Sequence, residues 1–244
     1  MNIMIIGATR GIGLALATHY ASQGARLALC GRDIGRMDRH PLRSHAGVRL
    51  YQFDIADRCA LARAIQEFGK DRLDLVIVAA GQYVDAASLA TQPACGVALM
   101  QTNVVGLVQA FDAAAAVMIL QQYGQLVAIA SMAGLIEDYP GASLYSASKR
   151  AALAVCNVYR KALAPFGIAV TAIVPGYVDT VRLRELNGGD ASRKPFLQSE
   201  AVAVSQIADA IRRRKHQCVF PWQMHLLVRL FNFLPQGLRA LRRK

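Results

Sequence analysis

The chain has 244 residues, of which 54% are hydrophobic and 18% are charged, and its formal net charge at pH 7 is +12. This length and composition are typical of one large globular core, and they exclude an intrinsically disordered or low-complexity chain. The five cysteines are odd in number and lack the spacing of metal ligands, so we predict reduced thiols, no metal site and a cytoplasmic location.

The positive charge is concentrated at the C-terminal end. Residues 212–244 contain nine Lys or Arg residues and no Asp or Glu, which accounts for nine of the twelve net charges. Nucleic acid is a poor candidate for a partner, because these basic residues alternate with large aliphatic residues rather than with exposed polar groups.

Short apolar runs alternate with longer helix-like segments from the first residues onward. The run at 2–7 is too short for a signal peptide and is typical of a core strand. Further strands are predicted at 25–30, 48–53, 74–79, 125–130, 168–174 and 217–220. Helical patterns lie between them at 11–23, 57–69, 93–122, 143–165 and 199–214, with a weaker one near 33–40.

This alternation predicts the fold class. Strands separated by helices require right-handed crossovers, so we expect an α/β fold with a Rossmann-type, doubly wound parallel sheet of about seven strands and helices on both faces. In such a sheet, ligands bind beyond the carboxyl ends of the strands. We expect one catalytic domain over residues 1–221 and a basic, apolar, helical tail over residues 222–244.

A glycine-rich turn follows the first predicted strand and opens the first predicted helix. Its sequence is Gly7-Ala8-Thr9-Arg10-Gly11-Ile12-Gly13. Glycine allows a tight turn and a close approach of the backbone, and the start of a helix offers unpaired N–H groups and a positive dipole end to a pyrophosphate. The order of strand, turn and helix predicts a dinucleotide site, although the spacing G-x-x-x-G-x-G differs from the six-residue fingerprint.

The residues after the second predicted strand bear on the choice of dinucleotide. A site that binds the 2′-hydroxyl of the adenosine ribose needs a carboxylate near this point, but the chain has Gly31 followed by Arg32. The guanidinium groups of Arg10 and Arg32 are suited to a 2′-phosphate, because their planar donors match phosphate oxygens. Asp33, one place later, favours NADH instead. We predict that the chain prefers NADPH to NADH.

Tyr145 and Lys149 stand four residues apart in a predicted helix, which places both side chains on one face. An ammonium group beside a phenol favours the phenolate and lowers the pKa of the tyrosine, which is about 10 in the free amino acid. A tyrosine tuned in this way can pass a proton to or from a carbonyl or hydroxyl oxygen. The same spacing also occurs on solvated helix faces, so the interpretation depends on the rest of the chain.

Taken together, these motifs resemble the short-chain dehydrogenase/reductase family over residues 1 to about 180. The matching motifs are, in chain order, the glycine turn, Asp54-Ile55 after the third strand, Asn103 in the helix 93–122, Ser131 after the fifth strand, Tyr145 with Lys149, and Pro175-Gly176-Tyr177-Val178-Asp179-Thr180 after the sixth strand. The resemblance implies an oxidoreductase that uses NADP(H).

The resemblance also implies a role for each reactive residue. Tyr145 would be the general acid in carbonyl reduction and the general base in alcohol oxidation, while Lys149 would lower its pKa and bind the nicotinamide ribose. Ser131 would hold the substrate oxygen. Asn103 would kink its helix and seat a water that links Lys149 to solvent. Together with the two arginines, the implied cofactor-binding set is Gly7, Thr9, Arg10, Gly11, Ile12, Gly13, Arg32, Asp54, Ile55, Ala79, Ala80, Gly81, Tyr145, Lys149, Pro175, Gly176, Val178 and Thr180.

Two features depart from the family pattern. The family has Asn-Asn-Ala-Gly after the fourth strand, whereas this chain has Val78-Ala79-Ala80-Gly81, so two amide side chains are absent. This change affects local hydrogen bonds on the adenosine side more than the reaction. Ser131 lies fourteen residues before Tyr145, about one more than is usual, and an inserted residue within 136–139 would absorb the difference.

The end of the chain and the substrate allow several interpretations. Residues 222–244 contain an apolar run with Trp, Phe and Arg that is too short to span a bilayer. This segment fits an interfacial helix on anionic lipid at the inner face of the membrane, a helix packed on its own domain, or a subunit contact. Membrane contact would make a hydrophobic or lipid-like carbonyl the natural substrate. Three tyrosines have two open interpretations, as pocket-lining residues or as ordinary packing residues, and packing is favoured for each: Tyr83, Tyr139 and Tyr177.

The leading hypothesis is an NADP(H)-dependent oxidoreductase that interconverts a carbonyl and a secondary alcohol. The alternative is a non-catalytic NADP(H)-binding sensor, or a membrane-linked interaction protein, on the same fold. Retention of Asn103, Ser131, Tyr145 and Lys149 argues against the alternative, because a sensor needs neither the serine nor the tyrosine. By analogy with the family, we expect a homodimer or homotetramer formed through the helices at 93–122 and 143–165.

Overall fold

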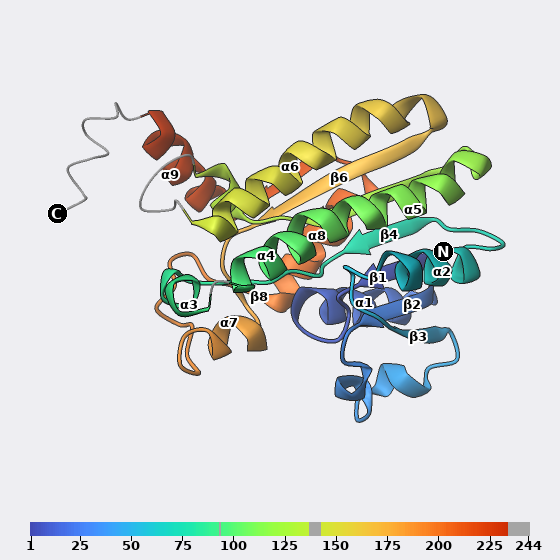
Figure 1. The fold of residues 1–244 in the computed structure, drawn as a ribbon, viewed down its shortest axis with the longest axis horizontal. Helices are drawn as coiled ribbons and strands as arrows, with labels where there is room; N and C mark the ends of the chain where they lie inside the picture. Colours follow the sequence, from blue (N-terminus) through green and yellow to red (C-terminus); the bar gives the residue numbers. More distant parts are fainter. Residues whose placement is uncertain (93, 137–142, 234–244) are drawn as a thin grey trace.

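The computed structural model describes residues 1–92, 94–136 and 143–233, and a seven-stranded parallel sheet runs through its centre (Figure 1). Its strands are β1 (Asn2–Ile6), β2 (Arg26–Gly31), β3 (Val48–Gln52), β4 (Leu75–Val78), β5 (Gly124–Ile129), β6 (Ile168–Pro175) and β9 (Gln217–Phe220). The order across the sheet is β3-β2-β1-β4-β5-β6-β9. The predicted fold class is confirmed, and each predicted strand ends within one residue of its prediction.

The sheet reverses its winding between β1 and β4. Ile5 of β1 pairs with Leu29 of β2 on one side and with Ile77 of β4 on the other. The connections that leave these strands diverge to opposite sides, and this divergence opens a crevice at their carboxyl ends. The inner strands are apolar on both faces because helices cover both faces, and β4 is buried along its whole length.

Two layers of helices cover the sheet. One layer contains α2 (Arg58–Phe68), α5 (Gly106–Gln121) and α6 (Leu144–Leu163), and the other contains α1 (Gly11–Ser22) and α8 (Glu200–Arg212). Figure 1 shows α5 and α6 running side by side across the near face of the sheet. Each layer therefore has its own apolar core against the sheet.

The helix predicted at 93–122 is interrupted. It consists of α4 (Ala94–Met100), one π-helical turn (Gln101–Val105) and α5. By length and apolar composition, the stretch Ala94–Gln121 is the one helix among the described residues that could cross a membrane. In this fold, its α5 portion packs on the sheet between α2 and α6, which is the environment of a core helix.

Some short elements differ from the predictions. The weak helix predicted near 33–40 is instead a pair of 3₁₀ turns, Ile34–Met37 and Pro41–Ser44. Pro41 lacks a backbone N–H, so it cannot donate a hydrogen bond that would continue the first turn, and it begins the second turn. Four short elements were not predicted, since each is too short to produce a periodic pattern. They are α3 (Ala86–Thr91), β7 (Val178–Asp179), α7 (Val181–Glu185) and β8 (Gln198–Ser199).

The predicted tail begins with a helix that packs on the domain. Helix α9 (Trp222–Phe233) follows β9 and contacts that strand. The side-chain amide of Asn232 donates to the carbonyl oxygen of Leu135 over 2.7 Å, which connects α9 to the segment after β5. The rest of the predicted tail, 234–244, lies outside the described residues.

Candidate active site

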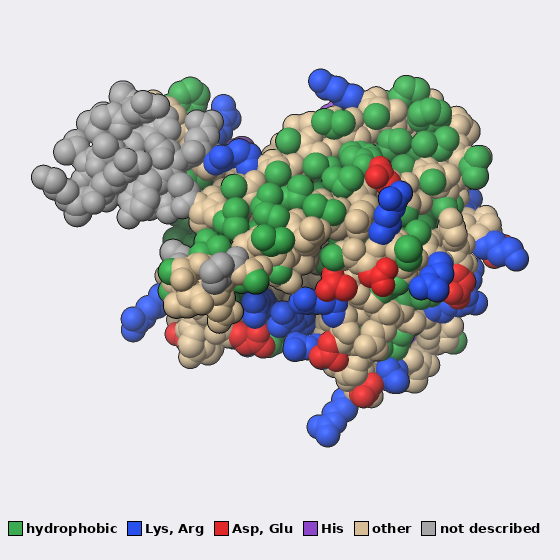
Figure 2. Space-filling model, viewed as in Figure 1, with side chains coloured by type: hydrophobic (Ala, Val, Ile, Leu, Met, Phe, Trp, Pro, Cys, Tyr) green, Lys and Arg blue, Asp and Glu red, His purple; other side chains and the backbone are tan. Residues whose placement is uncertain are grey.

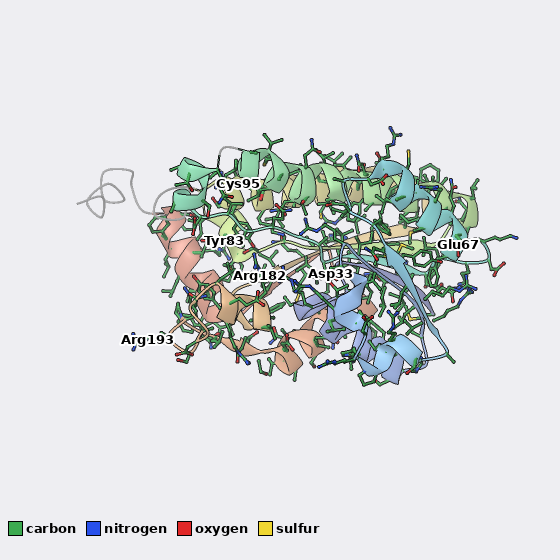
Figure 3. The ribbon with its side chains drawn as sticks, turned by 60° about the horizontal axis from the view of Figure 1, so that its bottom comes forward. Asp33, Glu67, Tyr83, Cys95, Arg182 and Arg193 are labelled. Carbon is green, nitrogen blue, oxygen red and sulfur yellow. The ribbon has the colours of Figure 1, made fainter. Side chains whose placement is uncertain are left out.

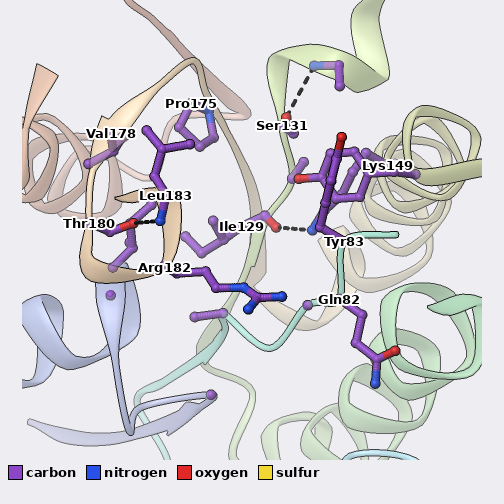
Figure 4. A pocket seen from close by; sticks show the side chains of 18 of the residues that line it. Gln82, Tyr83, Ile129, Ser131, Lys149, Pro175, Val178, Thr180, Arg182 and Leu183 are labelled. Carbon is purple, nitrogen blue, oxygen red and sulfur yellow. Dashed lines mark hydrogen bonds between the residues drawn. The ribbon is translucent and has the colours of Figure 1, made fainter. Parts of the chain in front are cut away.

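The carboxyl ends of β1, β2, β4, β5 and β6 surround one cavity of about 1390 Å³. The wall contains every residue of the predicted cofactor-binding set, together with Ser131. Of the predicted catalytic residues, only Asn103 is not part of the wall. The motifs that the sequence places at separate strand ends therefore meet at one site (Figure 4).

The glycine turn forms one end of the cavity and is packed too closely for side chains. Gly7 has a φ of +90°, and a Cβ there would lie 2.4 Å from the backbone nitrogen of Ala80. A Cβ on Gly13 would lie 2.1 Å from the carbonyl oxygen of Gly7. The residue before α1, Arg10, makes no side-chain hydrogen bond that caps the helix. This end of α1 therefore offers N–H donors to a phosphate, and the cradle fits a dinucleotide pyrophosphate.

Backbone hydrogen bonds hold the end of β4, where the family has two asparagines and this chain has Val78 and Ala79. The N–H groups of Ala79 and Ala80 both donate to the carbonyl oxygen of Ile6, each over 2.8 Å. These two bonds hold the end of β4 against the end of β1. The small alanine side chains leave room for the glycine turn, so the local geometry is kept without amide side chains.

Arginine side chains gather at the adenosine end of the cavity. Arg10 pairs with Glu185 at 3.3 Å, and Arg32 pairs with Asp54 at 3.6 Å. Arg36, which the sequence did not single out, pairs with Asp33 at 2.8 Å. The carboxylate that favoured NADH in the sequence is therefore already bound by a guanidinium group.

A further arginine joins this group from α7. Arg182 lines the cavity and lies 3.5 Å from Glu185, so one carboxylate is shared between Arg182 and Arg10. Burial lowers the pKa of Arg10, and the charges of Arg182 and Arg36 lower it further. Asp33 and Arg182 are both labelled in Figure 3. This end of the cavity carries an excess of positive charge, which suits phosphate groups.

The reactive residues lie at the other end, where α6 meets the end of β5. Ser143 begins α6 with a capping box, in which its side chain and that of Ser146 each accept a backbone N–H of the other residue. Tyr145 and Lys149 then follow on one face, and Nζ of Lys149 lies 5.8 Å from the centre of the Tyr145 ring. Nζ of Lys149 donates to the carbonyl oxygen of Ile129 over 3.0 Å.

Burial determines the pKa of both reactive side chains. Burial raises the pKa of Tyr145, although a hydrogen bond with the Ser131 side chain acts in the opposite direction. The sequence predicts a lowered pKa, and this prediction is wrong for the structure because loss of solvent outweighs the neighbouring groups. Burial also lowers the pKa of Lys149 to about 8. The lysine is therefore charged at neutral pH but loses its proton more readily than an exposed lysine.

Asn103 lies behind the cavity wall in the π-helical turn. Its side-chain oxygen accepts the N–H of Gln82 over 2.8 Å, and its amide nitrogen donates to the carbonyl oxygen of Gln82 over 2.9 Å and to Ser148 over 3.0 Å. These bonds connect the long helix to both the end of β4 and α6. The predicted distortion of the helix is present, and the predicted water remains a prediction.

The loop after β6 closes the nicotinamide side of the cavity. Pro175, Gly176 and Val178 line this side, and Thr180 begins α7 by accepting the N–H of Leu183 over 3.1 Å (Figure 4). Thr180 also contacts the glycine turn, since a Cβ on Gly11 would lie 3.8 Å from its side chain. The two cofactor-contacting loops therefore lie next to each other.

The structure adds wall residues that sequence reasoning missed. Tyr83 lines the cavity, and its ring meets Tyr145 edge to face at 5.1 Å, so the structure supports the less favoured interpretation of Tyr83, as a pocket-lining residue. Tyr177 lines the cavity as well, with Nζ of Lys194 above its ring at 5.3 Å, while Tyr139 lies outside the described residues. Helix α9 also contributes apolar side chains to the wall. In the sequence, the one signal for the role of Tyr83 in the wall was the position of an aromatic residue shortly after the end of β4.

Comparisons with known proteins agree with this geometry. A model of the short chain dehydrogenase family matches residues 1–190. Dehydrogenase/reductase SDR family member 7B from Bos taurus is 36% identical over 191 residues, covering 73% of this chain, and this chain spans only 58% of the length of that relative. A cyclohexanol dehydrogenase from Rhodococcus is 30% identical over 203 residues, covering 74% of this chain and 75% of that protein.

Solved structures show the same fold. A short chain dehydrogenase from Burkholderia cenocepacia in complex with NADP has a TM-score of 0.82 at 23% identity, covering 98% of this chain and 95% of that one. A short-chain dehydrogenase from Sphingobium yanoikuyae in complex with NADPH has a TM-score of 0.80 at 24% identity, covering 96% of each chain. The motifs, the fold and the family match lead to one conclusion: this chain belongs to the short-chain dehydrogenase family.

Proposed function

We propose that the chain is an NADP(H)-dependent oxidoreductase that interconverts a carbonyl and a secondary alcohol. The observation that carries this proposal is that Ser131, Tyr145 and Lys149 line the same cavity as the glycine turn. One relative is named for a secondary alcohol, cyclohexanol, and two solved relatives hold NADP or NADPH. No observation favours the alternative of a non-catalytic sensor.

The cavity wall fits the proposed cofactor from end to end. The glycine turn and the start of α1 would bind the pyrophosphate, and Arg10 and Arg32 would bind the 2′-phosphate. Asp54 and Ile55 would contact the adenine, Lys149 the nicotinamide ribose, and the loop at 175–180 the carboxamide side. When bound, the cofactor supplies the hydride chemistry, whereas the protein aligns the reactants and moves the proton.

The protein residues would act on the substrate oxygen. Ser131 would donate a hydrogen bond to this oxygen and stabilise the negative charge that develops on it. Tyr145 would then donate its phenolic proton to the same oxygen. Its raised pKa keeps the phenol protonated at neutral pH, which is the form that carbonyl reduction requires. The positive charge of Lys149 would stabilise the phenolate that remains.

We also propose that the chain forms a homodimer or homotetramer. Hydrophobic side chains gather over α5 and α6 on the face shown in Figure 2. Leu120 of α5 is 88% exposed, and Val158 of α6 is 65% exposed. Apolar surface of this kind is typical of protein interfaces.

Sedimentation velocity should give a dimer or tetramer at micromolar concentration, and a monomer under these conditions contradicts the proposal.

Finally, we propose that the protein is cytoplasmic and contacts the inner face of the membrane through α9. Trp222 and Phe233 are 69% and 78% exposed on the outer face of this helix. Residues 222–244 contain five Lys or Arg residues and no Asp or Glu, so their charge is complementary to anionic lipid. We therefore name an anionic lipid surface as the partner of this face.

The Tyr145→Phe variant tests the proton donor. Removing the hydroxyl should lower the rate of carbonyl-dependent NADPH oxidation by at least about a hundredfold, because the substrate oxygen loses its proton source. The affinity for NADPH, measured by fluorescence titration, should stay within about twofold, since the ring remains in place. Tyr159→Phe is the matched control, because this hydroxyl lies on the same helix but bonds to Asp112 outside the cavity. An unchanged rate in Tyr145→Phe would falsify the mechanism.

The double variant Arg10→Gln/Arg32→Gln tests the choice of cofactor. Loss of the charge-assisted hydrogen bonds should weaken NADPH binding at least about tenfold, while NADH binding should change by less than about threefold. Separate titrations with the two cofactors measure both effects. Arg43→Gln is the control, because this arginine pairs with Asp38 away from the cavity. Equal weakening of both cofactors would contradict the assignment.

The double variant Trp222→Ser/Phe233→Ser tests membrane contact. The wild-type chain should sediment with phosphatidylglycerol vesicles and not with phosphatidylcholine vesicles, because the contact needs both apolar burial and anionic charge. The variant should lose at least about nine tenths of this binding. Val202→Ser removes an exposed apolar side chain from α8 and serves as the control. Equal sedimentation of the wild type and the double variant would rule out contact through this face.

A further inference from the structure

Helix α9 presents one apolar face to the cavity. Met224, Val228 and Phe231 line the cavity at a spacing of four and then three residues, which places them on one side of the helix. Arg229, the only Lys, Arg, Asp or Glu residue in α9, is exposed and does not line the cavity. The contribution of α9 to the wall is therefore a continuous apolar strip.

Other elements complete this apolar wall around the reactive residues. Met132 and Ile136 come from the segment after β5, close in sequence to Ser131. Leu183 and Leu186 come from α7 and the residue that ends it. Two of the cations that line the cavity, Arg182 and Lys194, come from the segment after β6, but Arg182 is paired with Glu185, and Lys194 lies over the ring of Tyr177. Neither of them belongs to α9.

The wall along α9 reaches the surface of the molecule. Leu227 lines the cavity, yet it is 53% exposed to solvent. Leu230 likewise lines the cavity and is 55% exposed. An apolar strip that starts inside the cavity and continues to open surface can hold a chain longer than the cavity itself. Exposed apolar surface in such a position is typical of a ligand groove.

We infer that the substrate is a carbonyl compound with an extended aliphatic chain, and that this chain lies along the inner face of α9. The inference rests on the proposed function, because it places the carbonyl carbon beside Ser131 and Tyr145. In the reaction, a hydride from NADPH reaches the carbonyl carbon and a proton reaches the oxygen, which gives a secondary alcohol and NADP⁺. The structure assigns the selection of the substrate's chain length to α9, and it assigns proton transfer to Tyr145 of α6.

A series of straight-chain methyl ketones from butanone to dodecanone tests the inference with the full chain and NADPH. Each methylene that becomes buried against α9 should raise kcat/KM by about fourfold, until the chain passes the end of the wall. Leu227→Asn should reduce the advantage of decanone over butanone at least about tenfold. This loss is expected because a polar amide would replace the apolar contact.

Leu226→Asn is a matched control for this experiment. Leu226 is the neighbouring residue, is 49% exposed and does not line the cavity. In the absence of vesicles, this variant should keep the dependence of the wild type on chain length. A similar loss in both variants would show that damage to α9, rather than contact with the chain, causes the effect, and this result would overturn the inference.

The outcomes separate the inference from the proposed function. Turnover of butanone with no gain from longer chains would overturn the inference and leave the proposed function intact. Binding of the same ketones to the NADPH-loaded protein, followed by ligand-observed NMR, gives a measurement independent of turnover. Binding that grows with chain length and is weakened in Leu227→Asn, without any turnover, would support the chain site and contradict the proposed reaction. Absence of both turnover and binding would overturn both.

Discussion

The ammonium group of Lys149 is almost fully buried and donates to the carbonyl oxygen of Ile129, the last residue of β5. A buried charge is costly unless it is hydrogen-bonded, so this contact strongly favours one position of α6 against the end of the sheet. A glycine permits the approach, since a Cβ on Gly134 would lie 2.8 Å from the backbone of Lys149. Tyr145 belongs to α6 and Ser131 follows β5 by two residues, so this contact brings the two residues to the same part of the cavity.

At the opposite end of the cavity, the arginine side chains are held only by weak, partly exposed ion pairs. Each arginine there is partly exposed and pairs with a carboxylate over 2.8 to 3.6 Å. Exposed ion pairs contribute little stability, so they can be exchanged for phosphate oxygens at small cost. The carboxylates keep the guanidinium groups at the cavity without fixing them there. Rigid contacts therefore surround the reacting atoms, and exchangeable contacts surround the phosphates.

Local patterns in the sequence were sufficient to predict the sheet and the glycine turn, because each depends on neighbouring residues or on a strand end. The roles of Ser131, Tyr145 and Lys149 were implied by the family resemblance and stay a prediction. Three features depend on distant contacts and could not be predicted in this way. The π-helical turn is stabilised by bonds between Asn103 and Gln82, which are 21 residues apart. The direction of the Tyr145 pKa shift follows from burial, which neighbouring residues do not reveal. Helix α9 is apolar on most sides, so its periodicity could not show which face meets the cavity.

The position of α9 separates two properties that many enzymes combine in one element. Tyr145, the proposed proton donor, lies on α6 and Ser131 follows β5, whereas much of the apolar wall comes from α9, a helix of 12 residues. Substitutions within this helix can change the molecules that enter without moving the groups that react. Related chains can therefore diverge in specificity through this helix alone, and the same segment is a natural target for redesign.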